Sequence, residues 1–234
     1  MPEPDPLLAL FAQYNPAVWP LQPVAYLGVL AVVALIVVRP SRLADRLANA
    51  FLAALWLVIG VVFHGVFVRT LDPAQSVVYA TAFVAQAALF VTLGVVGSRV
   101  AYRPTRDAAS AVGLAAIAYA LVVYPLIGIV LGHPYPQAPL FGAAPCPTTI
   151  LTFGLLLLAR PPLPRVLLLV PLAWAVVATP AAVGRGVLED VALLGVAIAA
   201  VVLIATRARR SAFSRSSTGT AAGSPVASAP LAGS

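Results

Sequence analysis

Residues 21–46 read LQPVAYLGVLAVVALIVVRPSRLADR, in which eighteen residues without a charge are followed by three arginines within eight positions. About 20 mostly apolar residues suffice for a helix to cross the roughly 30 Å of hydrocarbon in a bilayer. The arginines indicate the side on which the run ends, because short cytoplasmic loops are enriched in Lys and Arg. The stretch therefore predicts a transmembrane helix over about 21–38 that ends in the cytoplasm.

Six further apolar segments continue this pattern along the chain. We expect helices over about 43–68, 76–98, 108–132, 145–159, 163–179 and 187–206. All fourteen basic residues are arginines, and only Arg69 and Arg185 fall outside the stretches that follow the first, third, fifth and seventh segments. The sequence thus predicts an all-α bundle of about seven transmembrane helices, with the N-terminus outside and the C-terminus cytoplasmic.

The composition agrees with a multi-pass membrane protein, and the helical spans indicate a cytoplasmic membrane. The chain is 62% hydrophobic and 9% charged, with a mean hydropathy of +1.01, whereas a soluble domain carries about 25% charged residues. The net charge of +7 is explained by topology, so we expect no nucleic-acid partner. The acidic start at residues 1–6 lacks the basic region of a cleavable signal peptide.

The fifth and sixth segments are less regular than the others. Two arrangements fit residues 145–179, namely two short spans or one re-entrant hairpin. A hairpin entering from outside would place Arg160 and Arg165 inside the bilayer, which is costly. Two short spans are therefore the preferred interpretation.

The chain divides into a transmembrane domain over 1–206 and a tail over 207–234. The tail is basic at first and then rich in Ser, Ala, Gly and Pro, a composition that predicts disorder. Arginines just inside the membrane attract anionic lipid. We expect such contacts at Arg207, Arg209 and Arg210.

Polar residues gather on the predicted outer side, and they include both histidines and the single cysteine. His64 lies about one turn inside the end of its segment, where an unpaired imidazole is costly. Either it is hydrogen-bonded across the bundle or it is a ligand-binding or catalytic residue. His133 lies in a loop that follows a helix, where a structural role is the simpler interpretation.

The sequence PCPTT at 145–149 is a second candidate site. Pro147 suits a first helical turn, and the free N–H groups beyond it, with the hydroxyls of Thr148 and Thr149, would bind an anion or a polar ligand. The alternative is a rigid capped loop in which Cys146 fills apolar space. Because the segment is short, its start is expected below the membrane surface.

Glu189 is the last candidate, at the outer start of the seventh segment. A carboxylate there favours the helix dipole and can pair with Arg185. Alternatively, Glu189 turns inward and fixes the tautomer of His64.

Several functional classes lack the residues they need. A retinal protein needs a lysine for its Schiff base, and the chain has no lysine. All seven acids lie at or beyond segment ends, which weakens a proton- or ion-coupled pump. Because no catalytic signature is present either, no catalytic residue is predicted.

Several short motifs resemble a family of bacterial multi-pass membrane proteins that is catalogued as a domain of unknown function. They are residues 11–15 (FAQYN), Trp19-Pro20, Gln22, 132–136 (GHPYP), 145–149 (PCPTT) and Phe153-Gly154. The resemblance spans about residues 7–206. It implies the membrane class and no activity.

Three hypotheses for function remain open. The first is a non-enzymatic protein that binds or conducts a small molecule through a pocket open to the outer face. Its site residues would be His64, His133, Cys146, Thr148, Thr149 and Glu189. The second is a membrane oxidoreductase in which His64, His133 and Cys146 ligate haem or a transition metal such as copper. The third is an accessory subunit without a site.

Overall fold

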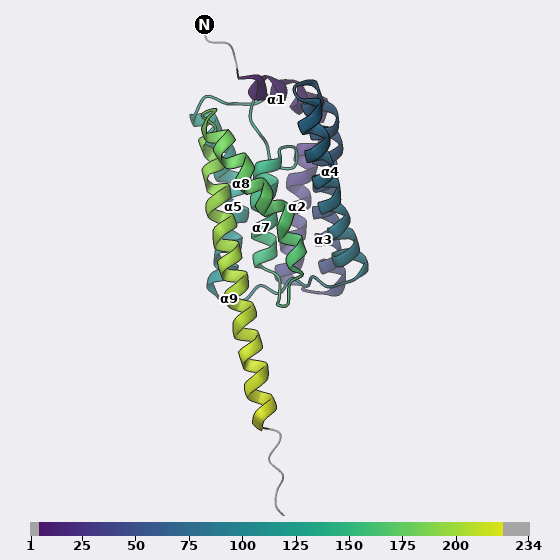
Figure 1. Cartoon of the computed structure of the whole chain (residues 1–234), viewed down its shortest axis with the longest axis vertical. Coiled ribbons are helices and arrows are strands. Elements are labelled where there is room, and N and C mark those ends of the chain that lie inside the picture. The colour runs from purple at the N-terminus through teal and green to yellow at the C-terminus, as the bar shows by residue number, and fades with distance from the viewer. Residues whose placement is uncertain (1–4, 222–234) are drawn as a thin grey trace, which may run out of the picture.

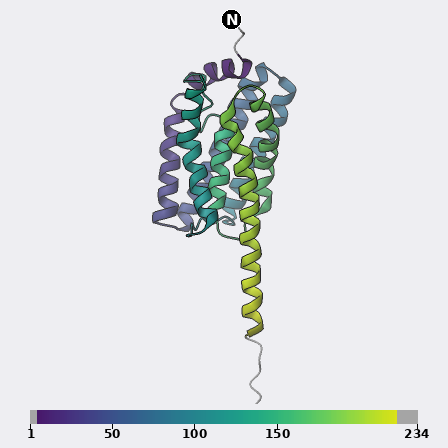
Figure 2. The ribbon, with the colours of Figure 1, turned by 90° about the vertical axis from the view of Figure 1, so that its left-hand side faces the viewer.

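The computed structural model describes residues 5–221, with side chains as far as Ser211, and in this range the chain forms helices and loops. The one strand-like pairing among these residues is an isolated bridge between Tyr102 and Ala159. The helices stand side by side, with α1 lying across one end and α9 leaving by the other (Figures 1 and 2). The predicted all-α membrane bundle is confirmed.

The helices follow the predicted segments closely. They are α1 (Pro6–Ala17), α2 (Leu21–Val38), α3 (Arg42–Val58) continued by η1 (Ile59–Phe67) and η2 (Val68–Thr70), α4 (Pro73–Leu89) continued by η3 (Phe90–Val96), α5 (Ala108–Ala118) continued by η4 (Tyr119–Val123) and α6 (Tyr124–Val130), α7 (Pro145–Leu157), η5 (Arg165–Leu168) leading to α8 (Leu169–Val183), and η6 (Leu188–Asp190) leading to α9 (Val191–Ala221).

Six helical segments among the described residues are long and apolar enough to cross a membrane, close to the seven predicted. The remaining predicted segment forms α7, which is shorter than these six, since its 13 residues span about 20 Å at 1.5 Å per residue. The two ends of the described chain still lie at opposite ends of the bundle (Figure 1). The loop over 131–144 descends into the bundle and meets the start of α7 there. The loop and α7 together therefore connect the N-terminal side of the bundle to its opposite end.

We call the end that α1 covers the N-terminal end of the bundle, and the end where α9 leaves the C-terminal end. The loops over 131–144 and 184–187 belong to the first, and those over 97–107 and 158–164 belong to the second. The predicted span of 145–159 thus runs from inside the bundle to the C-terminal end.

Helix α7 is the centre of the bundle, and all 13 of its residues are buried. It packs against α3, α5, α8 and α9, which surround it in Figure 2. Its final carbonyls are paired by two other segments. Arg207 of α9 donates to the Leu157 carbonyl, and the backbone N–H of Arg103 donates to the Leu158 carbonyl at 2.9 Å.

The crossing of α5 and α7 depends on a pair of glycines, Gly113 and Gly154. A Cβ added at Gly154 would lie 2.8 Å from the Gly113 carbonyl oxygen, and one added at Gly113 would lie 2.7 Å from the Gly154 carbonyl oxygen. Such distances are below van der Waals contact, so the two backbones touch only because both residues lack a side chain. Close approach of this kind is a common basis of helix association in membranes.

Helix α9 continues beyond the boundary at residue 206 that the composition suggested. It is helical to Ala221, because a formed helix adds each further residue at little cost. The part of the predicted disordered tail over 222–234 lies outside the described residues.

The glycine contact can be tested with Gly154→Ala. We expect the variant to lose about 1–3 kcal/mol of unfolding free energy, the usual range for overpacking a tight core. The measurement is the thermal unfolding midpoint of the purified protein in one detergent. Gly195→Ala in α9 is the matched control, because a Cβ there meets no atom within 4 Å. Equal midpoints for the two variants would contradict the close crossing of α5 and α7.

Candidate functional site

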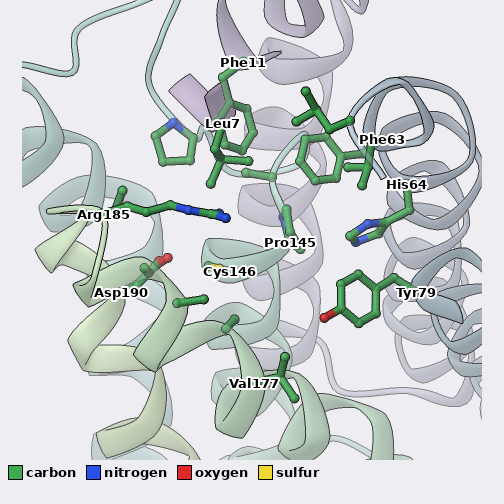
Figure 3. Close-up of a pocket in the computed structure, with 18 of the residues that line it drawn as sticks. Leu7, Phe11, Phe63, His64, Tyr79, Pro145, Cys146, Val177, Arg185 and Asp190 are labelled. Carbon is green, nitrogen blue, oxygen red and sulfur yellow. The ribbon is translucent and has the colours of Figure 1, made fainter. Parts of the chain in front are cut away.

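A cavity of about 530 Å³ lies at the N-terminal end of the bundle, between α1, η1, α4, the start of α7, α8 and η6. Figure 3 shows side chains from these elements converging on it. Most of the lining is apolar or aromatic. Its polar members are His64, Asp72, Gln75, Tyr79, Cys146, Trp174, Arg185 and Asp190. A cavity of this size with a few polar groups is typical of a small-molecule site.

Helix α1 covers the cavity, with Leu7 and Phe11 above it in Figure 3. Asp5 caps the start of α1, because its side chain accepts a hydrogen bond from Leu7 N–H at 2.8 Å. The same carboxylate lies 3.9 Å from Nε of Arg185, in the loop between α8 and α9. One ion pair therefore connects the cover to the opposite rim of the cavity.

The far end of α1 is held more firmly, through Asn15. The Asn15 amide donates to the carbonyls of Pro136 and Ala138, both at 2.7 Å. Gln22 in turn donates to the Asn15 carbonyl at 3.1 Å. The FAQYN, Gln22 and GHPYP motifs of the sequence therefore meet at one place. Their shared role is to fix α1 and the descending loop at the N-terminal end.

His64 faces the cavity from η1 (Figure 3) and is only 1% exposed. Neither ring nitrogen has a hydrogen-bond partner among the described residues. The aromatic rings around it, at centroid distances of 4.7 to 5.4 Å, belong to Phe63, Tyr79, Phe83 and Trp174. Buried polar groups are nearly always paired in folded proteins. An imidazole left unpaired at a cavity wall therefore points to a bound molecule as its partner.

Trp174 of α8 presents a second unpaired group to the same cavity. Its indole N–H is buried beside the Cys146 thiol, and it makes no hydrogen bond of normal geometry within the described part of the chain. The contrast with Trp56 is informative, since the indole of Trp56 donates to Thr152 Oγ1 at 3.0 Å. The bundle thus satisfies one buried tryptophan from within and leaves the cavity-lining one open.

Cys146 and Asp190 lie next to each other on the side of the cavity opposite His64 (Figure 3). Asp190 is buried, and it accepts a hydrogen bond from the Tyr124 hydroxyl at 2.5 Å. Cys146 lies in the first turn of α7 and is 8% exposed. The start of α7 therefore brings its thiol to the inner wall of the cavity.

The two threonines predicted at this helix start turn away from the cavity. The Thr148 hydroxyl donates to the Ala144 carbonyl and that of Thr149 donates to the Pro145 carbonyl, both at 2.8 Å. Neither threonine lines the cavity. Their hydroxyls bond back to the preceding turn, as hydroxyls in membrane helices commonly do.

His133 and Glu189 form a separate pair beside the cavity. His133 Nδ1 lies 3.8 Å from Glu189 Oε1, too far for a hydrogen bond, and the fully buried Glu189 carboxylate has no hydrogen-bond partner among the described residues. Glu189 therefore lies beside His133, where the sequence also allowed it to face His64. Arg185, expected near Glu189, instead has Asp5 as its ion-pair partner.

The predicted metal candidates His64, His133 and Cys146 do not converge with further ligands. Within the described residues, no three His, Cys, Asp or Glu side chains lie close enough to hold one metal ion. Of the six predicted site residues, the structure brings His64 and Cys146 to the cavity. The other four, His133, Thr148, Thr149 and Glu189, lie near the cavity without lining it.

Trp174 belongs to the site, although it is not among the residues predicted from the sequence. One signal was available, because Trp174 falls well inside its span, whereas tryptophan in membrane helices is enriched at the two interfaces. A tryptophan at that depth needs a partner for its N–H group.

The comparisons place these motifs in a family. The model of a family of unknown function (DUF6064) matches residues 5–215, which confirms the resemblance predicted from the sequence. No curated protein and no solved structure matches the chain.

The unpaired state of His64 predicts the outcome of His64→Phe. We expect its unfolding free energy to be unchanged or raised by up to about 1–3 kcal/mol, the cost of leaving a buried polar group unpaired. Thermal unfolding in detergent is the measurement. A clear loss of stability would show that another protein group pairs with His64.

Two tryptophan variants calibrate this result. Trp56→Phe breaks the bond to Thr152, whereas Trp174→Phe breaks no hydrogen bond within the described residues. Trp56→Phe is therefore expected to cost more stability than Trp174→Phe.

Proposed function

The chain belongs to DUF6064, and we propose that it is a membrane protein that binds a small, mostly apolar molecule in the cavity between α1 and α7. The observation that carries the proposal is the pair of unpaired, buried polar groups on the cavity wall, the imidazole of His64 and the indole N–H of Trp174. Leaving them unpaired costs stability. Such a cost is commonly retained where it serves binding.

The lining indicates what kind of molecule fits. A neutral imidazole offers one donor and one acceptor, and an indole offers a donor only. A carbonyl or ether oxygen accepts from the N–H groups of His64 and Trp174, and a hydroxyl group can in addition donate to the acceptor nitrogen of the imidazole. The aromatic rings around His64 and the aliphatic side chains of α1 suit the apolar remainder of such a molecule.

Binding is favoured over conduction by the position of α7. The cavity ends at the first turn of α7, and every residue from there to Leu157 is buried. A molecule that entered at the N-terminal end would therefore meet a packed helix rather than a continuous path. Conduction would require α7 to leave the centre of the bundle.

The cavity is proposed to open toward the outside of the cell. Only two of the fourteen arginines lie at the N-terminal end, Arg69 in η2 and Arg185 in the loop over 184–187. The excess of arginine at the opposite end favours a cytoplasmic location for that end.

Cys146 provides a direct test, because it is the only cysteine in the chain and it lines the cavity. In the purified, folded protein, we expect methyl methanethiosulfonate, a small neutral reagent, to modify Cys146. Ala178→Phe should slow the modification by at least about tenfold, equal to about 1.4 kcal/mol, because the larger side chain fills the cavity.

Two controls accompany this test. Val176→Phe, on the exposed side of the same helix, should leave the rate unchanged. The double variant Cys146→Ser, Ala120→Cys carries a buried thiol outside the cavity and should stay unmodified. Equal rates for Ala178→Phe and the unaltered protein would contradict an accessible cavity.

A small-molecule panel then tests occupancy. Amphipathic compounds with an oxygen acceptor are expected to slow the modification of Cys146, and Trp174→Phe should weaken this protection. If the compounds protected Cys146 equally well in Trp174→Phe, in His64→Phe and in the unaltered protein, neither residue would contribute to ligand recognition.

A further inference from the structure

A second cavity, of about 540 Å³, lies at the C-terminal end of the bundle, where α9 passes the end of α7. Four arginines line it, namely Arg103, Arg160, Arg207 and Arg210, with Asp107 as the single acid. These residues come from the loop that precedes α5, from the loop that follows α7, and from α9. The fold therefore brings distant basic residues to one place.

Arg103 is fixed by an acid from α3. Its guanidinium makes two bonds to Asp45, at 2.8 and 3.0 Å, and the Asp45 carboxylate also accepts from Tyr102 N–H at 2.8 Å. A two-bond pair of this kind sets the orientation of the guanidinium as well as its position.

The position of Arg160 follows from the backbone next to Arg103. The Arg160 N–H donates to the Ala101 carbonyl at 2.8 Å, and the Arg103 N–H donates to the Leu158 carbonyl at 2.9 Å. These bonds flank the bridge between Tyr102 and Ala159. The two arginines are consequently held on neighbouring strands of chain.

Arg207 was expected to attract lipid, but the structure engages it within the protein. Its guanidinium bonds to Asp107, to the Ser110 hydroxyl at 3.0 Å and to the Leu157 carbonyl. The hydrogen bond from the Arg207 guanidinium, together with that from the Ser110 backbone N–H, holds the pKa of the Asp107 carboxyl well below its usual range. The pair thus stays charged and mutually neutralised at physiological pH.

Arg160 and Arg210 are the two arginines of this cavity that have no carboxylate partner among the described side chains. Neither forms an ion pair with any residue whose side chain the structure describes, and both are exposed. Since Arg103 and Arg207 are each balanced by one carboxylate, the cavity keeps two uncompensated positive charges. Arg209, the third arginine expected to attract lipid, does not line it.

We infer that this cavity binds the phosphate head group of an anionic phospholipid, through Arg160 and Arg210. Guanidinium groups match the oxygens of a phosphate in planar, two-bond geometry. The volume of the cavity exceeds that of a single small anion and suits a head group. Its place at the end of the apolar spans is where the head groups of a bilayer lie, and basic pockets between membrane helices are known to hold such lipids.

The test is native mass spectrometry of the full chain with phosphatidylglycerol, using phosphatidylcholine as the neutral comparison. The double variant Arg160→Gln, Arg210→Gln should lose at least about tenfold in apparent affinity for phosphatidylglycerol. The matched control, Arg165→Gln with Arg209→Gln, removes the same charge from this end without touching the cavity and should bind as the unaltered protein does.

Three outcomes would overturn the inference. The first is equal loss in both double variants, which would mean attraction by general charge. The second is no preference for phosphatidylglycerol over phosphatidylcholine in the unaltered protein. The third is full competition by inorganic phosphate at equal concentration, which would identify a free anion as the occupant. Equal thermal unfolding midpoints for the variants would confirm that the fold is retained.

Discussion

The enclosure of α7 is the constraint on which the rest of the structure depends. A helix end enclosed by the bundle has no water to pair its free backbone N–H and C=O groups, so other parts of the protein must pair these groups or the sequence must lack them. At the start of α7, Pro145 and Pro147 remove two N–H groups outright. At the other end, the Leu157 carbonyl accepts a hydrogen bond from Arg207, a residue 50 positions later in the chain. The loops at both ends of the bundle are shaped by these requirements.

The two cavities are consequences of the same arrangement. Because α7 is shorter than the helices around it, its first turn lies below the N-terminal end, and α1 covers the space above it. At the other end, the carbonyls of the last turn of α7 accept hydrogen bonds from Arg207 and from the backbone of Arg103, so these arginines lie close together there. One short helix thus leaves an apolar cavity on one side and a basic cavity on the other, with packed side chains between them.

Much of the architecture was predictable because it depends on local composition. The run of 21–38 matches α2 residue for residue, since its ends are marked by Pro20 and Arg39. The site was predictable only in part. The depth of His64 and the motif around Cys146 were visible in sequence. The pairing of Glu189 with His133 was not, because it depends on how α9 is rotated against α6.

The most direct test of this account is the side from which Cys146 can be reached in the membrane. The reagent is sulfonatoethyl methanethiosulfonate, which is anionic and does not cross bilayers, and the unmodified thiol is counted afterwards in the unfolded protein. The account predicts modification in intact cells and none in inside-out vesicles, because α7 closes the cavity toward the arginine-rich end. Modification from inside-out vesicles alone would contradict both the orientation and the closed inner end of the cavity.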